Sequence, residues 1–296
     1  IFPFGYSYVA ASDSSVYYDT SNKVTNQGVM VADTAAANSE GGKAQGAGAT
    51  YGGDKAVHAF GNNSGGTIST KNLITNEGVV GADVTGVGTA RLELSAVSYG
   101  VGNALFAFGT SDSGVVNTRN LVNDVGVIAS DASGAGTAST SRYETSYGGL
   151  DAGTALIALG SNSGTRNLVS NTGVVASDST SGNATSRTQG AGCTFGEDRG
   201  ILMTGSADQS NIVSNTGVIA DDVSFSGTGA ISCAACGYGG DKGILGFGNG
   251  GNPTGGARFG LARTNTINNS GTVSSDVTRV SGVTGKTTEQ ASSFGN

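Results

Sequence analysis

The repeat that decides the fold is clearest in residues 167–178, which read Asn-Leu-Val-Ser-Asn-Thr-Gly-Val-Val-Ala-Ser-Asp. In this stretch an Asp stands five residues after a Gly. The same spacing occurs six times in the 296 residues, at Gly28/Asp33, Gly78/Asp83, Gly126/Asp131, Gly173/Asp178, Gly217/Asp222 and Gly271/Asp276. Two residues before each Gly is an Asn or an Asp, and both types suit a tight hairpin because they accept left-handed backbone angles. Six matches predict a repeated structural unit.

A second signal is an aromatic residue followed by Gly, 21 to 23 residues after each of those glycines. The six aromatic residues are Tyr51, Tyr99, Tyr147, Phe195, Tyr238 and Phe294. From this order we expect four short strands per unit, for example at 55–60, 72–75, 79–83 and 91–98. Units of 43 to 56 residues with such short strands cannot bury a hydrophobic face without neighbours. The units must therefore stack or close into a ring.

Small side chains gather at 45–49, 95–98, 189–193 and 233–236, as expected for inner strands crowded around an axis. We therefore predict an all-β fold, a six-bladed β-propeller of four-stranded blades, with residues 1–296 as one domain. The repeats start near 51, 99, 147, 195 and 238, and a sixth is shared by 294–296 and 1–50. Residues 1–5 resemble the back half of a unit and 293–296 resemble its front half, which predicts closure between N- and C-terminal strands and removes an open sheet edge. An open β-repeat array is the alternative.

The composition limits the partners. The chain is glycine-rich, with 52 Gly and 2 Pro, and it has a net charge of −7 and a pI near 4.6. Nucleic acid is not expected, because phosphate binding gains its affinity from clustered Lys and Arg. No run of about 18 apolar residues is present, so we expect no membrane insertion.

Two long stretches carry a family resemblance. Residues 238–248, Tyr-Gly-Gly-Asp-Lys-Gly-Ile-Leu-Gly-Phe-Gly, and the stretch 167–178 resemble a repeat of virion and tail proteins of marine and freshwater bacteriophages, and 85–91 fits the same pattern. The order of strands and turns looks like kelch-type propellers. The resemblance implies a rigid structural or adhesive module in a virion or an extracellular setting. Its partners would be other virion proteins or a host-surface receptor or glycan, and it implies no catalytic residue.

Residue types that could support chemistry are few. His58 is the single histidine and alternates with apolar residues, so we expect a packed or half-exposed strand residue. Cys193, Cys233 and Cys236 are expected to be small buried thiols, with a disulfide or a metal site as the alternative. The six repeated aspartates are expected to be equivalent and to accept structural hydrogen bonds, with a repeated Ca²⁺ site as the alternative. We predict no enzyme activity, no metal and no cofactor.

The connections between units differ in length. Twenty-four residues separate Phe4 from Gly28 and Phe247 from Gly271, whereas the corresponding spans elsewhere are 13 to 18 residues. Varied loops on one face of a scaffold are typical of binding surfaces. Aromatic and Arg side chains of the two long connections are therefore candidate binding residues, with packing over a blade edge as the alternative: Tyr6, Tyr8, Tyr17, Tyr18, Arg258, Phe259 and Arg263. A secreted lectin-like module is a second reading of the function, and a polysaccharide-degrading enzyme is a less favoured third.

Overall fold

A computed structural model describes residues 1–9, 14–37, 40–134, 136–140, 143–147, 153–160, 164–182, 184–203, 208–228, 230–250, 259–278, 282–287 and 291–294. Within these residues every regular element is a β-strand, which confirms the predicted all-β class. The same residues include no helix that is long and apolar enough to cross a membrane.

The longer strands of the described residues form six antiparallel sheets, which we number in chain order. Sheet 1 contains β1 (Phe2–Val9), β2 (Ser14–Asn22) and β3 (Thr34–Ala35); sheet 2 contains β4 (Ala47–Tyr51), β5 (Lys55–Ala59) and β8 (Lys71–Ile74). Sheet 3 contains β9 (Ser95–Tyr99), β10 (Asn103–Ala107), β13 (Thr118–Val122) and β14 (Ala132–Ser133). Sheet 4 contains β15 (Tyr143–Tyr147), β16 (Thr154–Ala158), β17 (Thr165–Val169) and β18 (Ser179–Thr180).

Sheets 5 and 6 have the same order of strands. Sheet 5 contains β19 (Ala191–Phe195), β20 (Arg199–Met203), β21 (Gln209–Val213) and β22 (Val223–Ser224), and sheet 6 contains β23 (Ala234–Tyr238), β24 (Lys242–Gly246), β27 (Arg263–Ile267) and β28 (Val277–Thr278). Three small hairpins complete the described strands: β6 (Asn62–Asn63) with β7 (Gly66–Thr67), β11 (Thr110–Ser111) with β12 (Gly114–Val115), and β25 (Asn249–Gly250) with β26 (Phe259–Gly260).

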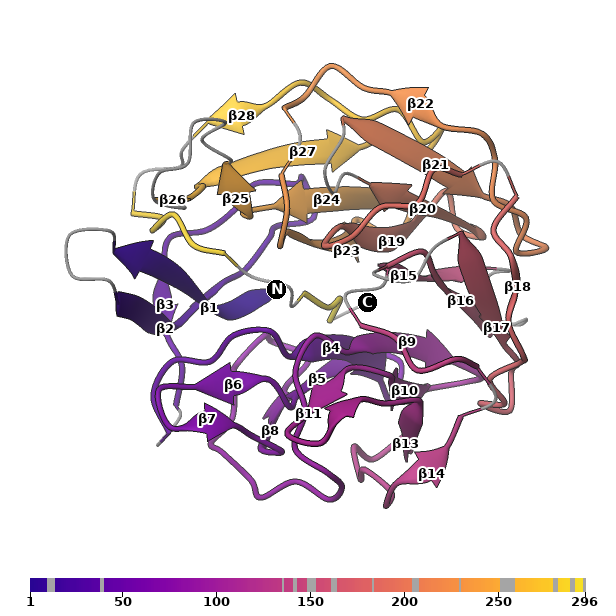
Figure 1. Ribbon diagram of the computed structural model, residues 1–296. Coiled ribbons are helices and arrows are strands. Elements are labelled where there is room, and N and C mark those ends of the chain that lie inside the picture. The colour runs from indigo at the N-terminus through magenta and orange to yellow at the C-terminus, as the bar shows by residue number, and fades with distance from the viewer. Residues whose placement is uncertain are drawn as a thin grey trace.

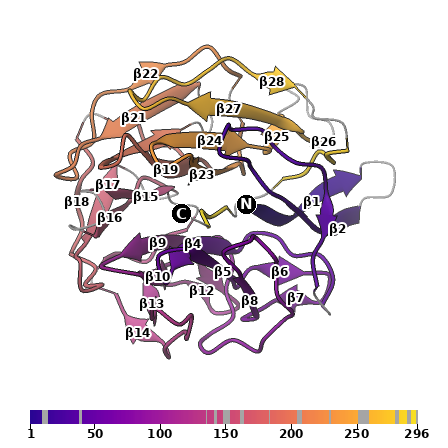
Figure 2. The same ribbon diagram turned by 180° about the vertical axis from the view of Figure 1, so that it is seen from behind.

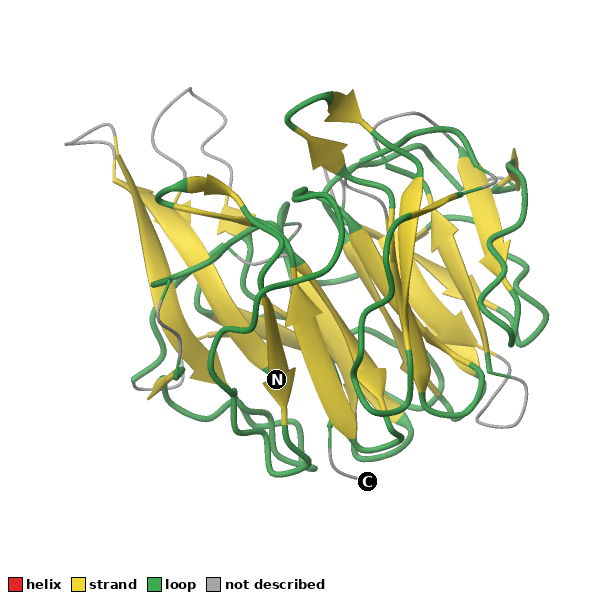
Figure 3. Cartoon of the chain, turned by 90° about the horizontal axis from the view of Figure 1, so that it is seen from below, coloured by secondary structure: helices red, strands yellow, loops and turns green. Residues whose placement is uncertain are grey.

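The six sheets are arranged side by side around a common centre (Figure 1), and the view from behind shows the same succession (Figure 2). Strands β4, β9, β15, β19 and β23 face the centre and contact one another in that order. They enclose a narrow cavity of about 90 Å³, lined by residues 48–50, 96–98, 144–146, 192–194, 235–237 and 291–293. Most of the residues around the centre are small, as the sequence predicts, and Glu144 of β15 is a large, charged exception. Seen from below, the strands of neighbouring sheets stand side by side between loops on two faces (Figure 3).

A belt of hydroxyl groups joins the inner strands. Each hydroxyl donates to a main-chain carbonyl of the neighbouring strand: Ser98 to Thr50 at 2.9 Å, Ser146 to Ser98 at 2.9 Å, Thr194 to Ser146 at 3.2 Å, Ser293 to Gly237 at 3.0 Å and Thr50 to Ser293 at 3.0 Å. Gly237 has no hydroxyl, so the belt lacks the bond from Gly237 to Thr194. Residues 291–293 form no strand, but Ser293 connects β23 and β4 in the belt, donating to Gly237 and accepting from Thr50.

The aromatic residue of each repeat covers the hairpin Gly of another sheet. A Cβ on these glycines would lie within 2.9 Å of the ring in all six cases: Gly126 under Tyr51, Gly173 under Tyr99, Gly217 under Tyr147, Gly271 under Phe195, Gly28 under Tyr238 and Gly78 under Phe294. All six glycines also have φ between 71° and 87°, a conformation that side chains rarely adopt. The Gly of the sequence motif is thus required twice, by the turn and by the ring above it.

The hairpin itself is held by a local side chain. Thr75 Oγ1, for example, accepts hydrogen bonds from the N–H groups of Glu77 and Val79 at 3.3 and 3.1 Å. Such bonds satisfy turn N–H groups that the strands leave free. Beyond the turn, the strand predicted at 79–83 is absent, and Val80 makes only an isolated bridge to Ile74.

The outermost strand was predicted in the wrong place. In sheet 3 it follows Asp131 as β14, and in sheets 4, 5 and 6 the corresponding strands also follow the Asp of the motif. Sheets 1 and 2 have three strands in their described parts, and in sheet 2 only a bridge between Lys71 and Val84 marks the fourth position. The reason is that the Asp side chain is engaged by other groups, so the regular ladder begins only beyond it.

Candidate functional site

The six aspartates of the motif lie in six similar hydrogen-bonded clusters. In each, an Asn eleven residues before the Asp donates from Nδ2 to Asp Oδ1 at 2.8 or 2.9 Å and to a nearby carbonyl at 3.0 or 3.1 Å. These residues are Asn22, Asn72, Asn120, Asn167, Asn211 and Asn265. The sequence analysis missed them, although the spacing of eleven residues holds in all six copies.

Each cluster also ties down the segment that precedes the inner strand. Thr89 donates to Asp131 from its N–H at 2.9 Å and from its hydroxyl at 2.6 Å. Thr284 makes the same pair of contacts to Asp33, with Oγ1 at 2.5 Å from Oδ2. The segment 282–287 therefore contacts sheet 1 as residues near 89 contact sheet 3.

The aspartates accept the same Asn hydrogen bond in all six copies, as expected from their equivalent places in the repeat, but they differ in exposure. Asp131 and Asp178 are exposed, whereas the other four are half-buried. Asp178 still accepts hydrogen bonds from Asn167 Nδ2 at 2.8 Å and from the Thr137 N–H at 3.1 Å. Its hydrogen bonds thus match those of the other copies, although solvent reaches it more freely.

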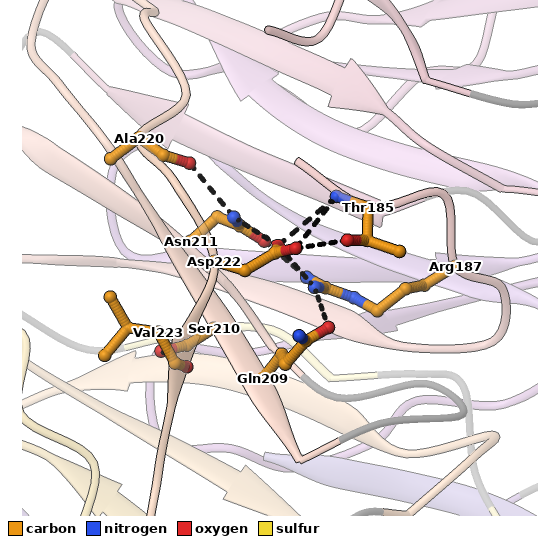
Figure 4. Close-up of polar contacts among 8 residues, drawn as sticks. All are labelled: Thr185, Arg187, Gln209, Ser210, Asn211, Ala220, Asp222 and Val223. Carbon is orange, nitrogen blue, oxygen red and sulfur yellow. Dashed lines mark hydrogen bonds and ion pairs between the residues drawn. The ribbon is translucent and has the colours of Figure 1, made fainter. Parts of the chain in front are cut away.

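Basic side chains complete several clusters. Arg187 donates to Asp222 at 2.9 Å and to Asn211, as Figure 4 shows. Lys43 forms an ion pair with Asp83, and the two side chains are only 3% and 6% exposed. Burial acts to raise the pKa of Asp83, but hydrogen bonds from Lys43 and Asn72 outweigh it and hold that pKa at about 2.

The clusters offer little to a metal ion. The Asp oxygens face N–H, O–H and ammonium or guanidinium groups, whereas Ca²⁺ requires six or more oxygen ligands. In the described part of the chain, no group of three or more His, Cys, Asp or Glu side chains is placed to hold a metal.

The two longest connections meet above the sheets. Strand β1 contacts β26, and the segment 282–287 joins them through bridges from Thr287 to Tyr6 and from Lys286 to Leu261. The β1–β2 hairpin, this segment and the β25–β26 hairpin thus lie side by side. We call these three pieces the upper surface.

Three of the predicted tyrosines lie on the β1–β2 hairpin, Tyr6 and Tyr17 on one face and Tyr18 on the other, because successive side chains of a strand point to opposite faces. Tyr6 and Tyr17 are cross-strand partners whose half-buried rings lie 6.1 Å apart at an angle of 30°. Tyr18 shares a hydrogen bond of 2.8 Å with Ser7, and the Tyr17 hydroxyl accepts one of 3.2 Å from Asn62 of β6. The result is an aromatic pair with hydroxyl and amide groups at its edge, an arrangement that suits protein or sugar ligands.

The other predicted binding residues have different positions. Arg263 is 13% exposed, donates to the Thr228 carbonyl and forms an ion pair of 3.2 Å with Asp276, so it belongs to a cluster and is not presented to a partner. Tyr8 lies in β1 and Phe259 in β26, where only the backbone is described. Arg258 lies outside the described residues.

His58 and the cysteines are buried. His58 is 1% exposed, and its Nε2 lies 2.8 Å from Ser292 Oγ. All three cysteines are buried and none of them forms a disulfide, which confirms the expectation of buried thiols. Burial, together with the nearby Cys236, raises the pKa of Cys193 far above its usual range, so this thiol stays protonated and unreactive.

Comparisons with known proteins show similarity at the level of the fold. A scan of protein-family models gave no match, and neither did a search of curated protein sequences. The solved structure of YjhT, a β-propeller-like protein, superposes with a TM-score of 0.58 at 10% identity, covering 82% of this chain and 86% of that one. The chain therefore has an all-β, propeller-like fold of small antiparallel sheets.

Proposed function

We propose that the chain is a six-bladed β-propeller closed by its two ends, and that it serves as a non-enzymatic structural or adhesive module. Three series of contacts support closure: the aromatic residues over hairpin glycines, the hydroxyl belt, and the Asn–Asp clusters. The aromatic residues over glycines and the Asn–Asp clusters involve all six sheets, and the hydroxyl belt lacks the bond between Gly237 and Thr194; residues of 282–287 and 291–294 contact the sheets beside them. The end segments also pair directly, with Ser292 N donating to Ile1 O at 3.1 Å and the Ile1 amine donating to Ser292 O at 2.7 Å.

The proposed binding site is the upper surface, with Tyr6 and Tyr17 as its centre. The observation that carries this assignment is the contact between the two longest connections, β1–β2 and β25–β26. The six aspartates, by contrast, are engaged within the scaffold, and we assign them a structural role. A rigid ring that presents one distinctive region is the usual organisation of a binding module.

We place this module in a phage virion or tail appendage, where it binds other virion proteins or a host-surface receptor. Its support is the resemblance of the repeat to virion and tail proteins, together with a surface rich in uncharged polar residues. A lectin-like glycan-binding propeller is the second candidate, and the Tyr6–Tyr17 pair is the feature that favours it.

The test combines two measurements on the same protein. In intact particles containing the chain, cross-links from residues 6, 17 and 62 should reach another virion protein or, after adsorption, the host surface. The isolated protein should be compared on a glycan array as wild type, as Tyr6→Ala/Tyr17→Ala, and as Val101→Ala. Val101 is 84% exposed and lies in the β9–β10 turn, at the opposite end of the strands, so its variant is the control.

Each outcome selects one reading. Tight binding of one glycan by the monomer, lost only in the tyrosine variant, would favour the lectin reading. Release of reducing ends from a host polysaccharide, lost on changing a single carboxylate, would overturn both binding proposals in favour of an enzyme.

A further inference from the structure

Lys286 is a buried amine at the junction of the two chain ends. Its side chain is fully buried, and its Nζ donates to the carbonyls of Phe2 and Thr20 at 3.4 and 3.2 Å. The Phe247 ring centre lies 5.0 Å away. One amine therefore contacts β1, β2 and the residue that follows β24.

Lys43 provides an internal reference for this site. It lies in the segment before β4, as Lys286 lies in the segment before 291–294, and it is also buried. Lys43 donates to Asn72 Oδ1 at 2.9 Å and pairs with Asp83. In sheet 2 the amine thus binds the Asn–Asp pair of its own cluster.

Lys286 does not use the equivalent pair of sheet 1. It makes no ion pair within 4 Å among the described residues, although Asp33 acts on it electrostatically. Asn22 Oδ1, the counterpart of the oxygen that Lys43 binds, is buried without a hydrogen-bond partner in the described structure, and so is Thr20 Oγ1. Asn22 Oδ1 is therefore a second acceptor for the amine, and no donor occupies it in the described structure.

The charges around Lys286 are few. Asp33 is the carboxylate that acts on it, while β1 and β2 present main-chain carbonyls, Phe247 presents its ring, and the β26 side contributes backbone at Leu261. Burial lowers the pKa of Lys286 to about 7, against the opposing effect of Asp33. The amine thus changes its charge in the physiological range of pH.

We propose that Lys286 is a proton-controlled latch: the neutral amine rests on the Phe2 and Thr20 carbonyls, and the ammonium moves to Asn22 and Asp33, as Lys43 binds Asn72 and Asp83. The movement breaks the hydrogen bonds from Lys286 to the Phe2 and Thr20 carbonyls, which lie at the base of the β1–β2 hairpin. Because Tyr6 and Tyr17 lie on that hairpin, acidification alters the part of the upper surface that carries the tyrosine pair through a buried residue of the segment 282–287.

The first test is a titration of the wild-type protein with ¹³C-labelled lysine. One lysine Cε signal should titrate near pH 7, should disappear in Lys286→Met and should remain in the matched variant Lys43→Met. The side-chain amide signal of Asn22 should move with the same midpoint. A latch is overturned if all lysines titrate near their ordinary value, or if the Asn22 signal does not follow Lys286.

A second variant keeps the test independent of whether Lys286→Met folds. Asp33→Asn removes the negative charge at the second position, so the Lys286 midpoint should fall further below 7. An unchanged midpoint would show that the ammonium does not bind there and would refute the proposal.

The latch also has a thermodynamic signature. The folded pKa of about 7 lies below the ordinary value of 10.5, so between these values the unfolded chain binds more protons and stability rises with pH. The unfolding constant should fall about tenfold per pH unit in this window. Lys286→Met should abolish the slope, and Lys43→Met should keep it.

Discussion

Sheets 1 and 2 are neighbours with the same parts, but their chain connections differ. In sheet 2 the entry segment, the inner strand and the outer strands follow one another along the chain. Sheet 1 contains strands from residues 1–35, and the segments 282–287 and 291–294 contact it through Thr284 with Asp33 and Ser292 with Ile1. The Asn–Asp cluster is nevertheless present in both. The repeated hydrogen bonds therefore do not require covalent continuity of the sheet.

The difference between the two sheets lies in their cations. Lys43 pairs with Asp83, whereas Lys286 rests on carbonyls and leaves Asn22 Oδ1 unpartnered. The hydrogen bonds between Asn and Asp are thus the constant part of the cluster, and the ion pair is an addition that differs between copies.

The largest expected effect is a difference in stability between variants of the Asp83 cluster in sheet 2 and of the Asp33 cluster in sheet 1. Asp83→Asn should cost about 3–5 kcal/mol, because it leaves the buried Lys43 charge with the more distant Glu40 carboxylate, at 3.8 Å, as its remaining ionic partner. Asp33→Asn should cost about 1–2 kcal/mol, because it weakens only hydrogen bonds. Urea denaturation at pH 7 measures both, and equal costs would show that the ion pair contributes nothing of its own.

The ion pair between Lys43 and Asp83 also predicts how stability changes at acidic pH. Since the pKa of Asp83 is lowered from 3.8 to about 2, its contribution is present above pH 4 and is lost as the pH falls toward 2. Asp83→Asn should therefore show a flatter loss of stability below pH 4 than the wild type. Parallel curves would contradict the assignment.

The next effect compares a ring inside the chain with one at its end. Tyr51→Ala should cost about 3 kcal/mol because the ring is buried over Gly126, and Phe294→Ala about 2 kcal/mol because its ring is half-buried over Gly78. Hydrogen exchange should distinguish them further. Phe294→Ala should expose the amide of Ser292, which Tyr51→Ala should leave protected.

A smaller effect concerns the glycines under those rings. Gly126→Ala and Gly78→Ala both place a side chain at positive φ and against a ring, and we expect a cost of about 1–3 kcal/mol. Gly78→Ala should cost the more of the two, because its Cβ would lie 2.5 Å from the Phe294 ring, against 2.9 Å between the Gly126 Cβ and the Tyr51 ring. Gly53→Ala, with φ of 83° and open space around its Cβ, measures the backbone cost alone. Equal values for all three would mean that the rings are not tightly packed.

The smallest expected effect is a gain in stability. Gly237→Ser should add the missing hydroxyl of the belt, since a Cβ there would lie 3.7 Å from the Thr194 carbonyl. We expect about 1 kcal/mol more stability than in the matched variant Gly237→Ala, which restores the side chain without the donor. Thermal unfolding compares the two, and an equal Tm would show that the belt does not contribute.

Much of the scaffold could be predicted from sequence because its determinants are local. The hairpin Gly, the residue before it and the small inner-strand residues recur at fixed spacing, so Gly78 and the stretch 45–49 were placed correctly. The fourth strand was misplaced because its start depends on how Asn72 and its equivalents engage the Asp. The Asn and the Asp are close in the chain, so this contact can be recognised in the sequence as a spacing of eleven residues. The exposure of Asp178 could not be predicted, because it depends on how far the neighbouring segment covers the edge of the sheet.

The candidate site was less predictable. The lengths of the two long connections indicated that they belong together, and β1 does contact β26. The role of Arg263 could not be inferred, because its ion pair with Asp276 depends on strand pairing across β27 and β28. Lys286 was missed because its partners are at the other end of the chain.

The hydroxyl belt has a direction. In the continuous part of the chain every hydroxyl donates to the strand that comes one repeat earlier, as Ser98 does to Thr50 and Ser146 does to Ser98. Each of these repeats thus brings one donor and one acceptor of its own, whereas the repeat of Gly237 brings an acceptor alone. Duplication or deletion of a hydroxyl-bearing repeat would therefore keep the numbers of donors and acceptors in the belt matched.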